Sequence, residues 1–283
     1  MAPPPPPPHA TVFEPYPDSF KFPDDHDDYD NNNHDDDDDD DLKLSSDTLL
    51  ALQSVLQEKE AVQKKFAELH RLAEERYAAV SMDVFEEDWQ QSQFWYSPST
   101  ANSLSLLLLS HLPPHSTIAL LSAPTVYVHL RQLRSQGKID PTIKLRLLEY
   151  DRRFEVFGDE FVFYDFASPV KGIPEELRGK CDRVLADPPF LEENCHTKAS
   201  QTVRYLTKPW DLSTPPEERS KIMLCTGERM RELLMKLYKD AGLRITDFKV
   251  RHQKCLANPY LCYSTWEDKE FMRFVEDDEV EPV

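Results

Sequence analysis

The chain has 283 residues, with 52 acidic and 33 basic side chains, so its net charge is −19. This balance argues against a protein that binds duplex DNA through a basic surface, since such domains usually have a high isoelectric point. No apolar run approaches the ~18 residues of a membrane-spanning helix, so we expect no transmembrane segment.

The charge is concentrated at the two ends of the chain. Residues 1–47 open on the proline run Pro3 to Pro8, contain the acidic run Asp35 to Asp41, and hold 15 acidic and two basic side chains. Residues 276–283 form an acidic tail with five acidic side chains. We expect residues 1–47 to be disordered, because they bury too little apolar surface to offset the entropy of ordering. The intervening residues are nearly neutral, and the acidic ends either favour a basic partner or aid solubility.

Residues 48–112 are predicted to form a helical N-terminal extension. Apolar side chains recur near helical spacing from Leu49 to Tyr77, with charged residues on the other face. Packing of this helix on the main domain is favoured over projection toward a partner. The aromatic cluster Phe94-Trp95-Tyr96 follows, and a second helix is expected over 100–111.

Residues 113–275 alternate short apolar runs with helical patterns, which predicts one α/β domain. We expect a Rossmann-like fold with a seven-stranded, mostly parallel sheet, helices on both faces and a C-terminal antiparallel hairpin. The expected strands are 117–122, 143–150, 161–166, 183–186, 221–226, 244–250 and 260–265. The expected helices are 125–135, part of 191–206, and 228–241, and residues 207–220 are expected to form a proline-rich loop.

The chain has five cysteines, and none of them has the spacing of a zinc site. An odd number of cysteines without a signal peptide predicts a reduced, cytoplasmic protein. We expect no metal ion.

Small or acidic residues stand at the ends of the first three predicted strands, where open α/β sheets bind their ligands. The first strand ends in Ser122-Ala123-Pro124, which is not a glycine-rich phosphate loop but allows a ligand close to the backbone. The second ends at Glu149, where a carboxylate commonly accepts the hydroxyls of a ribose, with Asp151 as the second choice. The third ends in Asp165-Phe166, which suits an adenine: the carboxylate meets its amino group and the ring packs on its face.

The fourth strand ends in Asp187-Pro188-Pro189-Phe190. The two prolines remove two N–H donors, which leaves a rigid group of acceptors beside an aromatic ring. Taken alone this is also an ordinary Pro-Pro turn. Together, the four strand ends fit S-adenosylmethionine and an amine substrate, without a metal or a phosphate site. Trp95 and its aromatic neighbours either cover this cofactor or pack in the core.

On these motifs the chain resembles the class I S-adenosylmethionine-dependent methyltransferases that carry a D-P-P-[FY] motif. More closely, it is similar to the eukaryotic group once labelled N6-adenine DNA methyltransferase-like and now regarded as elongation factor 1-alpha lysine methyltransferases. The resemblance covers about residues 85–266. It departs from class I enzymes in lacking a glycine-rich first loop, and Pro209–Pro216 resembles an insertion near the substrate side. The stretches that carry it are 93–96, 121–127, 148–154, 161–165, 186–190 and 224–227.

The resemblance implies a protein-lysine N-methyltransferase that uses S-adenosylmethionine. On this interpretation Asp187 and the Pro188 carbonyl accept hydrogen bonds from the lysine amine, and Phe190 forms the wall of its channel. The expected partner is elongation factor 1-alpha; nucleic acid and membranes are not expected partners, and we expect a monomer. Two alternatives remain: adenine-N6 methylation of DNA or RNA, with Phe190 stacking on a flipped base, and an inactive fold that only binds a partner.

Overall fold

The computed structural model describes residues 53, 56–57, 82, 85–88, 92–254, 256 and 258–275. The chain divides into two units, residues 1–57 and 58–283, and the sheet with its covering helices belongs to the second unit. The predicted disordered arm, the acidic tail and nearly all of the predicted long helix after Thr48 lie outside the described residues.

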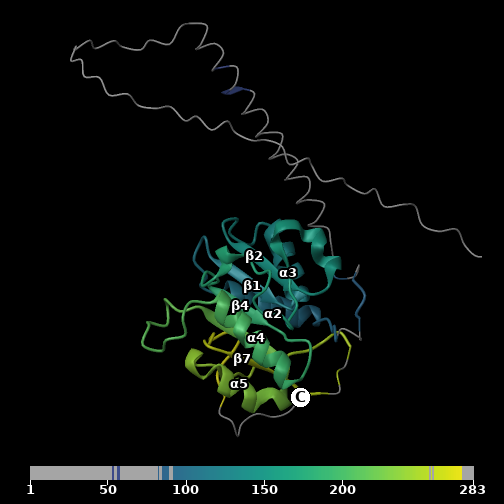
Figure 1. Ribbon diagram of the computed structural model, residues 1–283, viewed down its shortest axis with the longest axis vertical. Coiled ribbons are helices and arrows are strands. Elements are labelled where there is room, and N and C mark those ends of the chain that lie inside the picture. Colours follow the sequence, from purple (N-terminus) through teal and green to yellow (C-terminus); the bar gives the residue numbers. More distant parts are fainter. Residues whose placement is uncertain are drawn as a thin grey trace, which may run out of the picture. The chain divides into compact units, whose positions relative to one another are not determined.

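The described part of this unit is built on a seven-stranded sheet with the order β3-β2-β1-β4-β5-β7-β6 (Figure 1). Strands β1 to β5 are parallel, whereas β7 is antiparallel to both β5 and β6. The predicted fold class is thereby confirmed. The strands are β1 (Thr117–Leu121), β2 (Lys144–Glu149), β3 (Phe161–Phe163), β4 (Arg183–Ala186), β5 (Lys221–Gly227), β6 (Arg244–Ile245) and β7 (Tyr260–Ser264).

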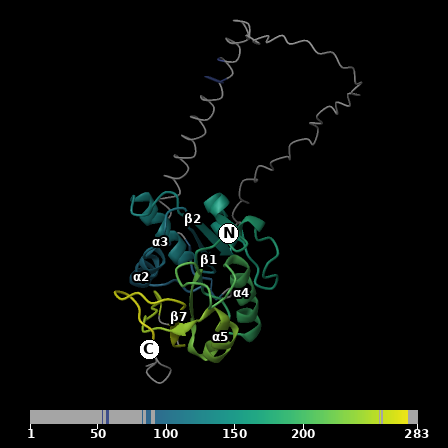
Figure 2. The same cartoon turned by 90° about the vertical axis from the view of Figure 1, so that its left-hand side faces the viewer.

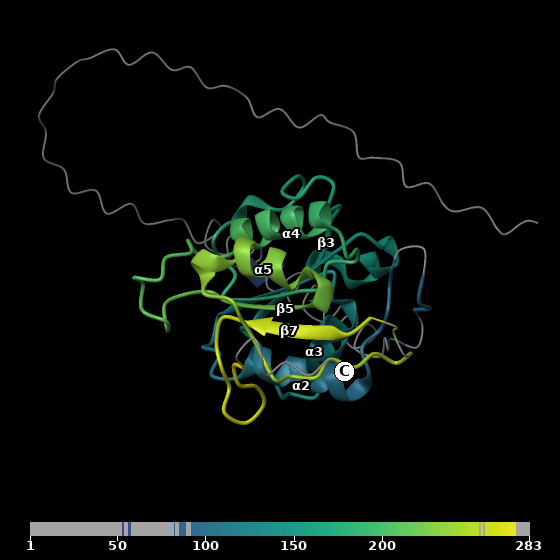
Figure 3. The same cartoon turned by 90° about the horizontal axis from the view of Figure 1, so that it is seen from below.

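Helices cover both faces of the sheet. In Figures 2 and 3, α2 and α3 lie on one side of the strands, and α4 and α5 lie on the other. The α-helices are α2 (Pro98–Leu109), α3 (Pro124–Ser135), α4 (Glu193–Leu206) and α5 (Arg231–Leu237). The 3₁₀ helices are η3 (Arg152–Glu160), η4 (Glu175–Leu177), η5 (Glu228–Met230) and η6 (Lys239–Ala241).

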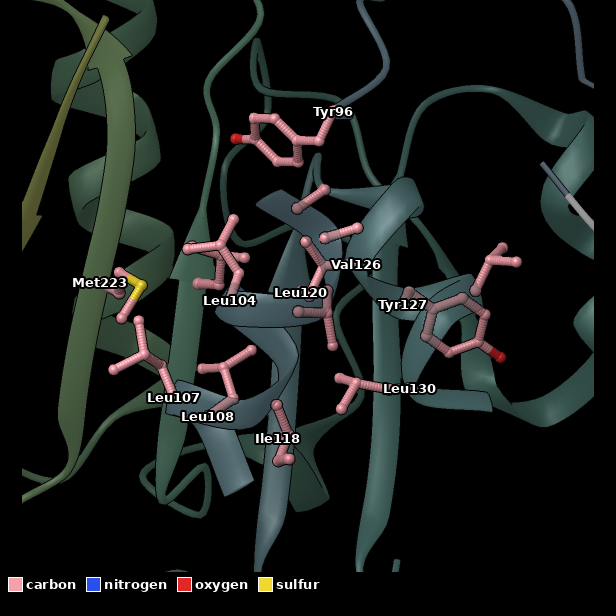
Figure 4. Close-up of a cluster of buried hydrophobic side chains, with 14 of the residues drawn as sticks. Tyr96, Leu104, Leu107, Leu108, Ile118, Leu120, Val126, Tyr127, Leu130 and Met223 are labelled. Atoms are coloured by element: carbon pink, nitrogen blue, oxygen red, sulfur yellow. The ribbon is translucent and has the colours of Figure 1, made fainter. Parts of the chain in front are cut away.

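The central strand β1 contributes to a separate core on each face. Ile118 and Leu120 pack among α2 and α3, while Ala119 and Leu121 join the cluster that includes α4 and α5. Burial on both sides explains why this strand is a continuous apolar run rather than an alternating one. Figure 4 shows the first core, where aliphatic side chains fill the middle and Tyr96 lies at one end.

Several elements differ in length from the sequence prediction. Helix α2 begins at Pro98 because the Ser97 hydroxyl caps it, accepting the Thr100 N–H at 3.2 Å. Strand β3 is shorter than expected, since the chain turns where the Asp165 side chain accepts the Ala167 N–H at 2.8 Å. Strand β6 has two residues, because Asp247 donates its N–H to the carbonyl of Arg273 rather than continuing the ladder with β7.

The predicted helix over 228–241 is broken into η5, α5 and η6, and it ends at Gly242 in the left-handed conformation (φ 73°). Helix η3 was not predicted, and it bends at Gly158, where φ is 60°. Helix α2, assigned from sequence to the N-terminal extension, shares the core of the sheet through Leu104, Leu107 and Leu108. Within the part of the chain that the structure describes, no helix is long and apolar enough to cross a membrane.

Candidate active site

The strand order creates a switch point between β1 and β4, which are neighbours although β2 and β3 come between them in sequence. Leu121 of β1 lies opposite Ala186 of β4, and beyond these ends lies a cavity of about 340 Å³. Such crevices are where open α/β sheets bind ligands. Every predicted site residue lines it except Pro188 and Asp151, the second choice for the ribose. The lining comprises Ser92 to Tyr96, Ser122 to Thr125, Glu149, Tyr150, Tyr164 to Phe166, Asp187, Pro189, Phe190, His252 and Tyr260.

The first wall of this cavity is the turn from β1 into α3. Ser122 has a left-handed backbone (φ 53°) and donates its N–H to the Leu148 carbonyl at 2.9 Å. Ala123 precedes α3, and no side chain caps that helix terminus, where Pro124 occupies the first turn. The turn therefore brings uncapped backbone N–H groups to the cavity without bulky side chains.

Glu149 ends β2 and is almost fully buried, with 6% of its surface exposed. Its Oε1 accepts the N–H groups of Tyr150 at 3.0 Å and Asp151 at 3.2 Å. No hydrogen bond within the described residues reaches Oε2. Burial raises the pKa of the Glu149 carboxyl to about 7, although the two backbone N–H groups oppose the shift. Oε2 is therefore available to accept a hydrogen bond, and a donor placed there would stabilise the charged form of Glu149.

Asp151, the second choice for the ribose, is not part of the cavity lining. Its Oδ2 accepts hydrogen bonds from Gln93 Nε2 at 3.0 Å and Arg153 Nε at 2.8 Å. Arg153 Nη2 also donates to Gln93 Oε1 at 2.9 Å. This network ties the segment before α2 to the start of η3, so Asp151 positions the aromatic cluster.

The residues after β3 connect the part of the cavity predicted for adenine with the part predicted for the amine. Asp165 and Phe166 both line the cavity. The rings of Phe166 and Phe190 are in contact, with centroids 5.6 Å apart and planes inclined at 60°. A single aromatic surface therefore runs from the end of β3 to the turn after β4.

Asp187 follows β4 directly, and its N–H donates to the Leu121 carbonyl at 2.9 Å. Its Oδ2 accepts a hydrogen bond from the Tyr96 hydroxyl at 2.5 Å. Burial raises the pKa of the Asp187 carboxyl to about 7, with a smaller contribution from the charge of Glu149, while the Tyr96 hydrogen bond opposes it. A carboxyl with this pKa binds a proton more readily than an ordinary aspartate does.

The segment 95–97 pairs with residues 251–253 from the other end of the domain. Tyr96 and His252 form an antiparallel bridge, flanked by the bonds Ser97 N to Arg251 O and Gln253 N to Trp95 O, both 2.8 Å. The His252 ring contacts Tyr96 at 5.1 Å and Tyr260 at 4.7 Å between centroids. Sequence reasoning missed His252 and Tyr260 as lining residues, because no motif marks the loop before β7 or the start of that strand.

Trp95 is both a cavity-lining residue and a core residue. Its side chain is buried, its indole N–H donates to the Phe85 carbonyl at 2.8 Å, and its ring meets Phe154 edge-on. The two interpretations of the aromatic cluster are therefore compatible.

A second hollow of about 440 Å³ adjoins the first. The two share Ser92, Phe94, Pro189, Phe190 and Tyr260 in their linings. The second is completed by residues of mixed character, namely Leu191, Glu192, Arg229, Lys254, Leu256 and Asn258. A long side chain that enters this hollow meets the turn after β4 next to Asp187.

The described residues contain no group of three or more His, Cys, Asp or Glu side chains arranged to hold a metal ion. The groups that line the cavity and can act on a ligand include carboxylates, hydroxyls, the Gln93 amide, the His252 imidazole, backbone N–H and carbonyl groups, and aromatic rings.

Comparison with known proteins gives one matching family model, described as "Probable N6-adenine methyltransferase", over residues 87–268. The chain is 39% identical over 232 residues to the protein-lysine N-methyltransferase EFM5 of Saccharomyces cerevisiae, covering 79% of this chain and 92% of the relative. It is 41% identical over 225 residues to the EEF1A lysine methyltransferase 1 of Gallus gallus, covering 78% and 92%. Against the protein of the same name in Danio rerio it is 44% identical over 182 residues, covering 63% and 98%.

Proposed function

The chain belongs to the methyltransferase family described as probable N6-adenine methyltransferases, and within it we propose that this member is an S-adenosylmethionine-dependent protein-lysine N-methyltransferase acting on translation elongation factor 1-alpha. The observation that carries the chemistry is the position of Asp187: it lines the first cavity, and it lies two residues before Pro189, which lines both hollows. The choice of lysine over adenine rests on the relatives, which are named for lysine methylation.

The first cavity fits S-adenosylmethionine in its donor set. In the proposed arrangement Glu149 Oε2 accepts hydrogen bonds from the ribose hydroxyls. The Asp165 carboxylate accepts from the amino group of adenine, and the Phe166 ring packs on the adenine face. The Ser122 N–H is bonded to Leu148 and Pro124 has no N–H, so the backbone donors for the amino-acid end would be Ala123 and the uncapped first turn of α3 at Thr125. A cationic sulfonium near the Glu149 and Asp187 carboxyls would favour their charged forms, which burial disfavours.

When bound, S-adenosylmethionine supplies an electrophilic methyl group on its sulfonium. We propose that Asp187 and the Pro188 carbonyl accept hydrogen bonds from the lysine amine and direct its lone pair toward that methyl group. Asp187 also accepts the proton that the lysine ammonium must lose. Phe190 walls the channel and stabilises the cationic product by a cation–π contact of ~0.5–2 kcal/mol. Orientation of this kind contributes up to ~7–11 kcal/mol in favourable cases.

The second hollow is the proposed route for the substrate lysine. The aliphatic stem would lie against Phe94, Phe190 and Tyr260, which also line the first cavity. The charged rim of Glu192, Arg229 and Lys254 would face the substrate surface. This division suits a side chain that is apolar along its length and polar at its end.

We further propose a cytoplasmic, monomeric enzyme. The four cysteines in the described part of the chain are all free thiols, which agrees with a reducing compartment. Elongation factor 1-alpha as the substrate is supported by the names of the relatives from Gallus gallus and Danio rerio.

The test is to incubate the protein and methyl-labelled cofactor with a cell lysate, with and without nuclease. We expect one nuclease-insensitive labelled protein with the mass of elongation factor 1-alpha, and a methylated lysine in its peptide map. Label confined to nuclease-sensitive material would refute the proposal in favour of adenine methylation. The Asp187→Asn protein is the control for label transferred by other enzymes in the lysate.

A further inference from the structure

The geometry points to Tyr96 as a positioning residue for Asp187: its hydroxyl fixes one carboxyl oxygen and thereby reserves the other for the substrate amine. The hydrogen bond from Tyr96 to Asp187 Oδ2 is 2.5 Å long and joins residues 91 positions apart. Within the described residues no hydrogen bond reaches Oδ1. This inference rests on the proposed function, because it assigns a role toward the same amine.

Three features hold Tyr96 in place: its position beside a helix cap, a backbone bridge and a ring contact. It directly precedes Ser97, the cap of α2. Its backbone forms the bridge with His252, and its ring contacts the imidazole of that residue. With only 1% of its surface exposed, the side chain has little freedom to turn away from Asp187. A donor anchored on a helix terminus and a strand-like bridge can fix a carboxyl precisely enough to orient an amine.

The groups around Asp187 define what the hydrogen bond does electrostatically. Burial is the main cause of the raised pKa of Asp187; the Tyr96 hydrogen bond lowers that pKa, and the nearby Glu149 carboxyl raises it further. Tyr260 and the Cys225 thiol also interact with Asp187, and the pKa of each is raised, so both are neutral at physiological pH. Tyr96 is therefore the neighbour that favours the charged form of Asp187, which is the form that accepts from the amine.

The test is to replace Tyr96 by Phe in the full chain and titrate Asp187 by carbon-13 NMR, with Asp187→Asn to assign its signal. Loss of a hydrogen bond to a carboxylate should raise the pKa of Asp187 by about one unit or more. In turnover, the acidic limb of the kcat/KM profile should move upward by the same amount, while the dissociation constant of the cofactor stays within about twofold. An Asp187 titration unchanged from wild type would overturn the inference.

The matched control is Tyr260→Phe, which removes another hydroxyl beside Asp187 without removing a hydrogen bond to it. The Asp187 titration should then stay as in wild type; an equal shift would mean that Tyr96 has no special role. If Tyr96→Phe does not fold, site-specific difluorotyrosine at position 96 gives a stronger donor, and the pKa of Asp187 should fall. The titration needs no turnover, so it tests Tyr96 even if the protein methylates no lysine.

Discussion

At the scale of single residues, the site depends on two carboxyls held away from water. Burial is the main cause of the raised pKa of both Glu149 and Asp187. A cavity lined by two such buried carboxyls is suited to receive a cation. Both the proposed cofactor and a lysine substrate carry positive charge.

Replacement of Asp187 by Asn should separate methyl transfer from cofactor binding. An amide oxygen accepts hydrogen bonds but takes no proton, so we expect turnover to fall by ~10²–10⁴-fold. Isothermal titration should still detect cofactor binding, because the proposed ribose and adenine contacts lie elsewhere. Asp182→Asn, at the opposite end of β4, is the control and should keep most of the activity. Undiminished transfer by the Asp187 variant would contradict the mechanism.

The two carboxyls also make stability depend on pH. The folded protein holds their protons up to about pH 7, whereas the ordinary values are 3.8 for Asp and 4.5 for Glu. Between these limits the folded state binds more protons than the unfolded state, so these groups lower stability as pH rises. In urea unfolding without cofactor, Asp187→Asn and Glu149→Gln should each gain stability relative to wild type from pH 4.5 to 7. Parallel pH curves for variant and wild type would exclude this linkage.

At the scale of elements, the end of β5 restricts the turn after β4. A methyl group on Gly227 would lie 2.7 Å from Leu191 Cδ1, and Leu191 follows Phe190 in the chain. The Leu191 carbonyl also accepts a hydrogen bond from Arg229 Nε at 3.1 Å. The strand end is therefore packed directly against the Leu191 side chain, which would have to shift to admit a methyl group at position 227.

We expect Gly227→Ala to lower kcat/KM by ~10-fold or more, because small displacements of an orienting group are costly. Leu191→Ala in the same chain should restore part of this loss by making room for the methyl group. Steady-state kinetics of both single variants and the double variant measure the coupling. Strictly additive losses would show that the contact does not position the turn.

At the scale of the whole molecule, charge separates the two candidate substrate classes. The net charge of −19 opposes contact with a phosphate backbone and favours a basic protein. In fluorescence anisotropy with a DNA duplex at 150 mM salt, we expect no binding tighter than ~10⁻⁶ M, the upper range of non-specific affinities. A variant with Asp35 to Asp41 changed to Asn should also fail to bind, since the rest of the chain lacks a basic excess. Strong binding by that variant would reopen the nucleic-acid alternative.

The site itself is a property of the whole molecule. Its lining combines residues before α2, the ends of four parallel strands, and the loop before β7. These segments meet because β7 lies between β5 and β6 and because residues 251–253 pair with 95–97. No segment of the described chain contains the site alone.

The sequence was sufficient to predict the fold class and the residues that follow the parallel strands. Buried parallel strands appear as short apolar runs, and acidic or small residues after them stand where ligands bind, so local pattern was enough for Glu149, Asp165 and Asp187. The sequence overestimated the lengths of β3 and β6. These strands end at two hydrogen bonds, from Ala167 N–H to the Asp165 side chain and from Asp247 N–H to the Arg273 carbonyl, which apolar spacing does not encode.

Which side chains face one another across the cavity could not be predicted from the sequence. The bond from Tyr96 to Asp187 joins residues far apart in sequence, and no motif marks His252 in the loop before β7 or Tyr260 at the start of that strand. Asp151 lies two residues from Glu149, yet Gln93 and Arg153 hold it outside the cavity lining. Sequence pattern reports which residues belong to one element, whereas contacts between elements depend on how the chain closes on itself.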